Sequence, residues 1–424
     1  MNEYCKEEIK KMGLSVYRVG GSVRDERLGL QIKDRDYVVV GSTVEEMVEK
    51  GYKRVGNYFP VFIHPKTGEE FALARRERKY GHGHTGFEVD TKDVTIEEDL
   101  GRRDITINSI AIGDDGVLID PCGGLKDLED GLIKQNSGAF SDDPLRVLRV
   151  ARFFARFYHL GFEVDSKTLS SMRSISKEEL SSITQERVWI ETEKALRTKN
   201  PEAYFILLKD VGVLEHVYPE IHDLIGKIQG SEFHAEGDAF QHSMMVLKVA
   251  SESTEDTEIR FASLVHDLGK GVSLEEKLPR HIGHEKKGVD IIERMCDRLH
   301  TPRKYKDLGM IGSEFHLKHH LVFEMTPQKI LKVLKRVDAF RKPSRFHQFL
   351  EVCRADYRGR VCKGENRRHD EYTQMDFMSE CRSGIMGIEV QDLCNKGYER
   401  RRFIQELHRL RLNEIKRVRG NFRV

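Results

Sequence analysis

The sequence is poor in the features that mark secreted and membrane proteins. Its seven cysteines are scattered, odd in number and without a C-x-x-C pair, which argues against a disulfide framework and a structural zinc site. No run approaches the ~18 apolar residues of a membrane span, and MNEYCKEEIKK at the start lacks the pattern of a signal peptide. We therefore expect a cytoplasmic protein in a reducing setting, with no membrane partner.

The charge of the chain is almost balanced, so no basic field covers the whole protein. Lys and Arg number 71 against 70 Asp and Glu. Positive charge is concentrated in residues 396–424, where it fits either a local surface for RNA or an ordinary solvated helix. The length of 424 residues exceeds what one core supports, and we expect about two to four domains.

Residues 17–40, YRVGGSVRDERLGLQIKDRDYVVV, carry the strongest pattern in the chain. An apolar run ends at Gly20 and Gly21, a short helix-like stretch follows, and a second strand opens with Asp34 and Asp36. Alternate residues of a strand share one face, so the two carboxylates should converge, which is costly unless a cation such as Mg²⁺ lies between them. The glycines let the backbone approach a ligand, and the helix start would hold a phosphate. A phosphate cradle beside a metal site is the apparatus of nucleotidyl transfer.

The order strand, GGSVRD, helix, DRD, strand resembles the head of the polymerase-β-like nucleotidyltransferases. The similar branch contains the tRNA CCA-adding enzymes and the bacterial poly(A) polymerases. This resemblance implies that Asp34 and Asp36 bind catalytic Mg²⁺. It also implies that Gly21 and Arg24 contact the phosphates of a nucleotide.

Residues 65–90 also fit the head of the polymerase-β-like nucleotidyltransferases. Residues 65–68, PKTG, predict a hairpin turn between two strands, and Glu70 stands at the start of the returning strand. The resembled fold takes a third catalytic carboxylate from such a strand; Glu70 is our candidate, and the adjacent Glu69 stays open. Residues 76–90 are polar and glycine-containing, which predicts a flexible surface loop. In the CCA-adding family a mobile loop at this place helps to switch specificity between C and A.

Two later segments match further motifs of the family. RRDITIN, with Arg103, Asp104 and Asn108, is similar to the motif that discriminates ribose and contacts the triphosphate. An ordinary salt bridge between Arg103 and Asp104 is the alternative. DPCGGLKDL, residues 120–128, has the form of the family's hinge motif, and its proline and paired glycines indicate a bend between domains.

Residues 140–162 begin a helical region with arginines at every third position. Such a ladder, here Arg146, Arg149 and Arg152, is usually a solvated face of a helix. The DDPLR segment, however, resembles the family's motif that reads the incoming base. The resemblance implies that Asp143 and Arg146 select the base, since Asp accepts from an exocyclic amine and Arg donates to ring acceptors. Arg149 and Arg152 would then contact the phosphates or the base.

The second half of the chain holds a different set of candidate metal ligands. His266 and Asp267 are neighbours in an apolar, helix-like segment, and burying such a pair is expensive without a metal or a partner. Together with His242 they follow the H…HD…D pattern and resemble the HD superfamily of phosphohydrolases. Asp356 is the better match for the last carboxylate, and Asp338 stays open.

Lys270, His281 and His284 lie close to this pair in sequence and are candidate assistants. Imidazoles with a carboxylate suit borderline divalent metals better than Mg²⁺. The resemblance implies Ni²⁺ or another divalent transition metal. It also implies phosphatase, 2′-nucleotidase and 2′,3′-cyclic phosphodiesterase activities.

These observations predict an α+β protein of four parts. A small polymerase-β-like head with a mixed sheet spans residues 1–138, and a mostly helical neck and body, for nucleotide selection and tRNA binding, spans 139–228. An all-α HD domain spans 229–360, and a basic helical tail spans 361–424.

The function implied by the resemblance is template-independent addition and repair of the 3′-terminal CCA of tRNA. CTP and ATP would be the substrates, the acceptor end of tRNA the partner, and the chain a monomer or a homodimer. One alternative is a CC-only, A-only or poly(A) polymerase. The other is an HD phosphohydrolase whose head binds nucleotides for regulation.

Overall fold

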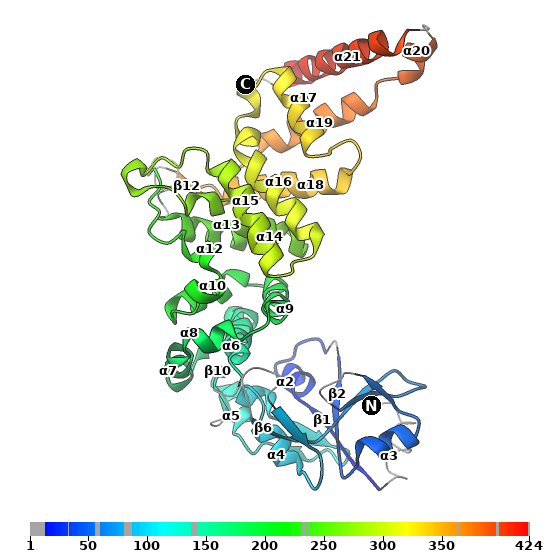
Figure 1. Cartoon of the computed structure of the whole chain (residues 1–424), viewed down its shortest axis with the longest axis vertical. Helices are drawn as coiled ribbons and strands as arrows, with labels where there is room; N and C mark the ends of the chain where they lie inside the picture. The colour runs from blue at the N-terminus through cyan, green and yellow to red at the C-terminus, as the bar shows by residue number, and fades with distance from the viewer. Residues whose placement is uncertain are drawn as a thin grey trace. The chain divides into compact units, whose positions relative to one another are not determined.

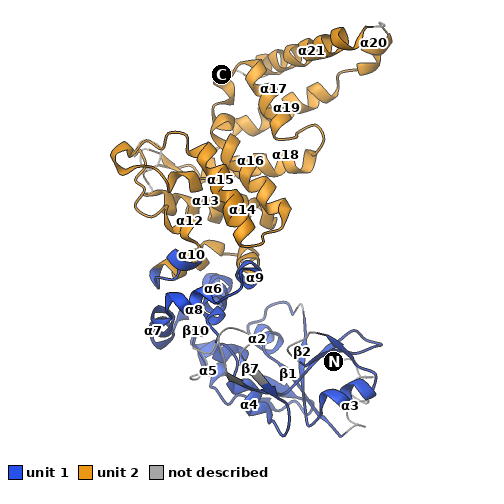
Figure 2. Ribbon diagram, viewed as in Figure 1, with its two compact units in different colours: residues 1–191, 210–217 blue, residues 192–209, 218–424 orange. Residues whose placement is uncertain are grey.

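The computed structural model describes residues 13–32, 34–55, 60–79, 87–136, 143–230, 235, 237–362, 365–395 and 398–422. The chain divides into two compact units, coloured separately in Figure 2. The first contains residues 1–191 and 210–217, and the second contains residues 192–209 and 218–424. None of the described helices combines the length and the apolar character that crossing a bilayer requires.

The head is built on one mixed sheet of seven strands in the order β3-β4-β5-β2-β1-β8-β9. Its strands are β1 (Ser15–Val19), β2 (Asp36–Val40), β3 (Lys53–Val55), β4 (Val61–Ile63), β5 (Glu70–Leu73), β8 (Ala111–Gly113) and β9 (Leu118–Ile119). β2 pairs with β1 antiparallel and with β5 parallel, which makes the sheet mixed. The mixed sheet followed by helices confirms the predicted α+β class (Figure 1).

Both faces of this sheet are covered, because residues of its central strands alternate between two apolar clusters. Tyr37 and Val39 of β2 belong to a cluster with Met47 of helix α3 (Val44–Glu49). Val38 of β2 points to the other face, in a cluster with Leu100 of helix α4 (Ile96–Gly101). The period of two along a strand explains this division.

The hairpin predicted between β4 and β5 is present, with antiparallel pairing of the two strands and a positive φ of 71° at Gly68. The predicted loop at residues 76–90 differs from expectation. Its flanks form a two-stranded antiparallel ribbon of β6 (Arg76–Lys79) and β7 (Phe87–Asp90). Residues 80–86, in the middle of the predicted loop, lie outside the described residues.

The predicted hinge segment caps a helix of the head. Both carboxylate oxygens of Asp120 accept from backbone N–H groups at the start of α5 (Gly124–Glu129), at 2.7 and 2.9 Å. A Cβ at Gly124 would collide with the backbone carbonyl of Thr106, so glycine allows α5 to lie against that segment. Asp127 accepts from the Thr106 hydroxyl at 2.7 Å. These contacts tie the segment to RRDITIN; a role as a hinge stays a prediction.

The remaining elements are mainly helical. Their bounds are α2 (Gly21–Arg27), β10 (Leu132–Ile133), α6 (Leu145–Phe157), β11 (Glu163–Val164), α7 (Ser166–Ser174), α8 (Lys177–Ser181), α9 (Gln185–Leu196), α10 (Pro201–Asp210), α11 (Leu214–Val217), α12 (Pro219–His222), α13 (Ala239–Ser253), α14 (Thr257–Val265), α15 (His284–Arg298), α16 (Arg303–His320), α17 (Pro327–Arg336), α18 (Pro343–Arg358), β12 (Val361–Cys362), β13 (Glu365–Asn366), α19 (Thr373–Met386), α20 (Val390–Asn395) and α21 (Arg400–Asn421).

The helices of the C-terminal segment share a core with the helices that precede them. One apolar cluster contains Phe349 of α18, Phe377 of α19 and Ile415 of α21, each fully buried. Burial of this kind couples segments by removing apolar surface from water. The four domain boundaries stay predictions, but the core is continuous across residue 360.

Candidate active sites

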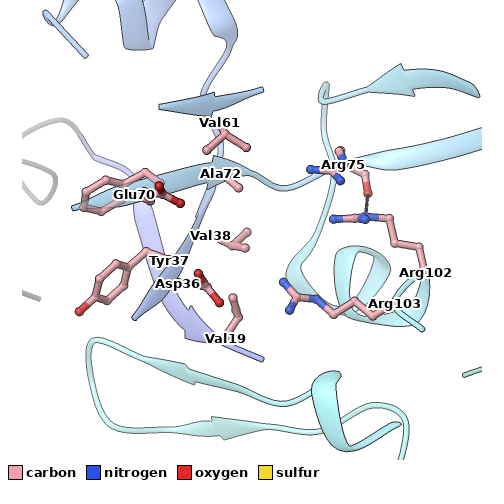
Figure 3. Close-up of a pocket in the computed structure, with 11 residues that line it drawn as sticks. Val19, Asp36, Tyr37, Val38, Val61, Glu70, Ala72, Arg75, Arg102 and Arg103 are labelled. Atoms are coloured by element: carbon pink, nitrogen blue, oxygen red, sulfur yellow. Dashed lines mark hydrogen bonds between the residues drawn. The ribbon is translucent and has the colours of Figure 1, made fainter. Parts of the chain in front are cut away.

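A pocket in the head gathers charged side chains of both signs (Figure 3). Asp36 and Glu70 supply carboxylates, and Arg75, Arg102 and Arg103 supply guanidinium groups. Carboxylates of this kind hold hard divalent cations, and guanidinium groups bind phosphate oxygens. The pocket therefore has the donor and acceptor types that a metal-bound triphosphate needs.

The two carboxylates of the pocket are neighbours because β2 and β5 are parallel. Tyr37 pairs with Phe71, and Asp36 and Glu70 each stand one residue before that pair. Asp34 precedes β2 and is exposed, so the strand begins two residues later than the sequence suggested. Glu69 belongs to the turn, where its side chain accepts from the Thr67 hydroxyl. Glu70, rather than Glu69, lines the pocket.

The surroundings of Asp36 disfavour its charge. The pKa of Asp36 is raised above its ordinary value, chiefly by desolvation; Arg103 opposes this shift and the charge of Asp34 adds to it. A divalent cation held between the carboxylates of Asp34 and Asp36 would offset the cost of keeping Asp36 charged. The donor set of Asp34 and Asp36 thus fits Mg²⁺.

Asp99, which the sequence analysis did not single out, organises the arginines of the pocket. It is fully buried within α4 and accepts from Arg103 Nη2 at 3.1 Å, from Arg102 Nε at 3.1 Å and from the backbone N–H of Arg75 at 3.3 Å. Burial alone would raise the pKa of Asp99, but the charges of Arg102 and Arg103 lower it below its ordinary value. The spacing of three and four residues in DLGRR was a signal for these pairs.

The glycine pair brings the chain close to Arg103. Gly20 has a φ of 65°, and a Cβ there would lie 2.8 Å from Nη1 of Arg103. That backbone conformation favours glycine, and the lack of a side chain leaves room for the guanidinium group. Gly21 begins α2. Its contact with a nucleotide phosphate stays a prediction.

Arg24 is buried within the head. Its Nε and Nη2 donate to Asp25 at 2.9 and 2.7 Å, and Nη1 donates to the side chain of Asn108. Its guanidinium group also lies 4.9 Å from the ring centroid of Phe157 in α6. Desolvation lowers the pKa of Arg24 to about 10. Arg24 therefore joins α2, RRDITIN and α6, and its predicted contact with phosphate stays untested.

Asp104 pairs with the neck helix. Its carboxylate accepts from Arg149 of α6 at 2.7 and 2.8 Å and from the side chain of Asn108 at 3.0 Å. Burial opposes the charge, yet Arg149 and Asn108 hold the pKa of Asp104 far below its ordinary value. The alternative of an Arg103–Asp104 salt bridge is wrong, because Arg103 pairs with Asp99 instead.

The arginine ladder of α6 faces the protein. Arg146 is 9 % exposed and donates to the backbone carbonyls of Arg102 and Arg103 at 2.7 and 3.4 Å. Arg152 is 8 % exposed and pairs with Glu191 of α9. A solvated face is therefore ruled out for these two residues. The predicted contacts of the ladder with a nucleotide stay predictions.

Asp143, the predicted base-reading carboxylate, is held by a residue that sequence reasoning missed. Arg187 of α9 donates to it through Nη2 at 2.6 Å and Nη1 at 3.3 Å. The same carboxylate accepts from the backbone N–H of Leu145 at 3.1 Å, at the start of α6. The orientation of Asp143 is thus fixed from both sides.

In the second unit, His242, His266 and Asp356 form one possible metal-binding group. Nε2 of His242 lies 3.2 Å from Oδ1 of Asp356, and Nε2 of His266 lies 3.7 Å from the same oxygen. All three side chains are buried. Asp338 lies elsewhere and pairs with Arg341 and with Arg345 of α18. Asp356 is therefore the carboxylate that meets the predicted histidines.

A second group contains Asp267, His284 and His316. Oδ1 of Asp267 lies 3.2 Å from Nε2 of His284 and 3.5 Å from Nε2 of His316. His284 comes close because a Cβ at Gly269 would collide with its carbonyl, a space that glycine leaves open. His316 was missed from the sequence, although its place in HLKHH on α16 shares a helix face with His320.

The imidazoles are oriented to present Nε2 to the centre of this cluster. Nδ1 of His266, His284 and His316 lies 2.8, 2.7 and 3.0 Å from the backbone carbonyls of Ser263, His281 and Gly312. A hydrogen bond of this kind fixes the tautomer and leaves Nε2 as a ligand. Burial lowers the pKa of His316 well below its ordinary value, which favours the neutral form.

Buried atoms of the cluster lack hydrogen-bond partners. Within the part of the chain that the structure describes, Nε2 of His266, Oδ1 of Asp267 and Nε2 of His284 are buried and make no hydrogen bond of acceptable geometry, although the last two atoms lie 3.2 Å apart. Burying such atoms is costly unless a water molecule or an ion binds them. The histidine and carboxylate donors fit a borderline divalent metal.

Two cations flank the cluster. Lys270 Nζ lies 2.6 Å from Oδ2 of Asp267, and Arg360 donates to both oxygens of Asp356 at 3.1 and 2.8 Å. The candidate assistant His281 is anchored instead to the Ser273 hydroxyl at 2.9 Å and the Ile228 carbonyl at 3.1 Å. Of the three candidate assistants, Lys270 and His284 reach the metal-binding groups through Asp267.

Comparison with known families divides the chain into three matched parts. The Poly A polymerase head domain matches residues 16–134, and the probable RNA and SrmB-binding site of polymerase A matches 161–225. The HD domain matches residues 239–342. These ranges contain the head pocket and most of the histidine cluster, although Asp356 lies beyond the last of them.

Similar proteins match along nearly the whole chain. The multifunctional CCA protein of Hahella chejuensis is 45% identical over 95% of this chain and 94% of its own length. That of Thioalkalivibrio sulfidiphilus is 44% identical over 96% and 100%, and that of Pasteurella multocida is 45% identical over 96% and 98%.

Solved structures show the same fold. A CCA-adding enzyme in apo form II has a TM-score of 0.67 at 22% identity, covering 98% of this chain and 90% of that one. The Thermotoga maritima CCA-adding enzyme complexed with tRNA has a TM-score of 0.61 at 21% identity, with the same coverage of 98% and 90%.

Proposed function

The chain belongs to the family of multifunctional CCA proteins, and we propose that it adds and repairs the 3′-terminal CCA of tRNA. CTP and ATP are the substrates and pyrophosphate is released. The observation that carries this proposal is the head pocket, where Asp36 and Glu70 stand on adjacent strands beside Arg103. The similarity to multifunctional CCA proteins over nearly the whole chain supports CCA addition among the activities that such a pocket could perform.

Asp34 and Asp36 would hold Mg²⁺, with Glu70 as the third carboxylate. Mg²⁺ held by these carboxylates would lower the charge of the triphosphate and make the tRNA 3′-hydroxyl more acidic. That hydroxyl attacks the α-phosphate in line, and pyrophosphate leaves. Arg103 binds the triphosphate oxygens from the opposite side of the pocket, in an orientation that Asp99 fixes.

Base selection falls to Asp143 and Arg146. Arg187 orients Asp143, and a carboxylate that accepts from Arg187 retains lone pairs for the exocyclic amine of C or A. Arg146 is bonded to the backbone of Arg102 and Arg103, so the base-reading side chain is linked directly to the segment that binds the triphosphate. Arg149 and Arg152 support the same helix or contact the nucleotide.

The histidine cluster would bind Ni²⁺ or another divalent transition metal and hydrolyse phosphoesters. The orphaned atoms of His266, Asp267 and His284 support this assignment. Such an ion makes a nucleophile available at neutral pH by acidifying a water molecule. Lys270 and Arg360 bring positive charge to the site, which favours a phosphate group. The activities proposed are phosphatase, 2′-nucleotidase and 2′,3′-cyclic phosphodiesterase.

One preparation tests both assignments. The purified chain is incubated with Mg²⁺, the four NTPs and a tRNA transcript that lacks its last three nucleotides, and the 3′ ends are sequenced. We expect ends that finish uniformly in CCA. A second portion, freed of metal with a chelator and reloaded with Ni²⁺, is expected to hydrolyse 2′,3′-cyclic AMP.

The alternatives predict different results in the same assay. Ends that stop at CC would indicate a CC-only polymerase, and addition of A only to transcripts that already end in CC would indicate an A-only polymerase. Ends with A tracts would indicate a poly(A) polymerase. No extension, with hydrolysis retained, would favour an HD phosphohydrolase with a regulatory head. Absence of hydrolysis with every divalent metal tested would refute the proposed phosphohydrolase activity of the histidine cluster.

A further inference from the structure

The C-terminal segment places one buried tyrosine against the histidine cluster of the HD domain. Tyr372, immediately before α19, is 5 % exposed. Its hydroxyl oxygen lies 2.6 Å from Nδ1 of His319 and 2.8 Å from Nδ1 of His320, the last two residues of α16. Tyr372 lies 30 residues past the end of the HD match at residue 342, so no part of that match assigns it a role.

His320 connects this tyrosine to the cluster. Nε2 of His320 lies 2.6 Å from Oδ2 of Asp356. Arg360 donates to the same oxygen at 2.8 Å. Oδ2 thus has two hydrogen-bond partners, whereas Oδ1 accepts from Nε of Arg360 at 3.1 Å and faces His242 and His266.

The hydrogen atoms along this path can be placed by elimination. A carboxylate only accepts, so Nε2 of His320 carries the proton, and Nδ1 of the neutral ring accepts from the Tyr372 hydroxyl. That hydroxyl has one hydrogen, so its oxygen accepts from Nδ1–H of His319. Nε2 of His319 is then unprotonated, and among the described residues it is buried without a hydrogen-bond partner. The chain of donors runs in one direction, from His319 through Tyr372 and His320 to Asp356.

We propose that Tyr372 is a positioning residue of the HD site, which acts through His320 to hold Asp356 in the orientation that binds metal. The inference rests on the proposed metal-dependent phosphohydrolase function of this site. Partners that orient a metal ligand in this way commonly change metal affinity or activity by ~10–100-fold when removed. The C-terminal segment therefore contributes to the HD chemistry and not only to the core.

Tyr372→Phe in the full chain tests the proposal, because it removes the hydroxyl and keeps the ring. The ring stacks on Tyr357, with 4.8 Å between centroids, and Phe preserves this packing. The metal-free protein is titrated with Co²⁺ as a probe, whose visible absorption reports histidine ligation. We expect the Kd for Co²⁺ to rise ~10–100-fold and hydrolysis of 2′,3′-cyclic AMP at limiting metal to fall in parallel. CCA addition by the same preparation should stay unchanged, and so should Co²⁺ binding by the matched control Tyr357→Phe.

A second substitution separates positioning from packing. If Tyr372 acts through His320, then adding Tyr372→Phe to a His320→Gln protein should cause no further loss of Co²⁺ affinity. Additive losses, or wild-type affinity and hydrolysis in Tyr372→Phe, would overturn the proposal. If His266→Ala also bound Co²⁺ with the wild-type absorption spectrum, the metal site itself, and not the role of Tyr372, would be refuted.

Discussion

At the scale of single residues, the sequence located side chains that belong to contiguous motifs and missed their distant partners. Asp36 and the His266–Asp267 pair stand in short motifs whose residue types alone suggest metal binding. Arg187 is 44 residues from Asp143, and no local pattern connects the two. Only the folded chain shows which carboxylate each arginine meets.

Asp99 gives a prediction about stability and pH. Asp99→Asn should lower the free energy of unfolding of the first unit by about 2–4 kcal/mol at pH 7, because Arg102 and Arg103 lose a buried charged partner. The pKa of Asp99 is lowered in the fold, so its contribution is present above the ordinary pKa of about 3.9 and is lost as pH falls toward the folded value. The difference in the free energy of unfolding between wild type and Asp99→Asn should thus be constant above about pH 5 and shrink below about pH 4.

Urea titrations at several pH values measure this difference. Asp130→Asn is the matched control, because Asp130 is an exposed carboxylate paired with Lys126 at the surface. A difference for Asp99→Asn that does not change with pH would contradict the role assigned to its charge.

At the scale of elements, α6 shows how far a helical pattern can be interpreted. The sequence predicted the helix and its arginines at every third position, but it left their environment open between solvent and nucleotide. In the fold, Arg149 meets Asp104, and Arg152 meets Glu191. These are contacts between elements distant in sequence, which the spacing along one helix cannot specify. The ribbon of β6 and β7 was also missed, because RERK, the sequence of β6, contains no apolar residue and so lacks the alternation that indicates a strand.

Arg149→Lys distinguishes a bracing role for α6 from a role in nucleotide binding. Lysine keeps the charge but loses the planar fork that meets Asp104. If Arg149 mainly braces the helix, the free energy of unfolding of the first unit should fall by about 1–2 kcal/mol, with KM for CTP and ATP little changed. A several-fold rise in both KM values with unchanged stability would assign Arg149 to the nucleotide. Arg173→Lys, an exposed position on α7, is the control.

At the scale of the whole molecule, two parts of one chain carry candidate metal ligands of different kinds. The head offers carboxylate oxygens, which suit Mg²⁺, whereas the HD site offers imidazole nitrogens and two buried carboxylates, which suit a borderline metal. The helical second half followed from sequence patterns, and the α+β class with its mixed sheet followed from the resemblance to polymerase-β-like nucleotidyltransferases. The inclusion of α19 and α21 in the core of the second unit could not be predicted, because their apolar residues do not indicate which helices they pack against.

We propose that the head pocket and the histidine cluster work independently in one protein. The most direct measurement compares wild type, Asp36→Asn and His266→Ala, each assayed for tRNA 3′ ends and for hydrolysis of 2′,3′-cyclic AMP. His347→Ala, an exposed histidine on the same helix as Asp356, serves as the control. We predict that Asp36→Asn loses CCA addition by at least about a hundredfold and keeps hydrolysis, and that His266→Ala does the reverse. Loss of both activities in either variant, with the fold intact, would contradict the independence of the two sites, and retention of CCA addition in Asp36→Asn would contradict the catalytic role of Asp36.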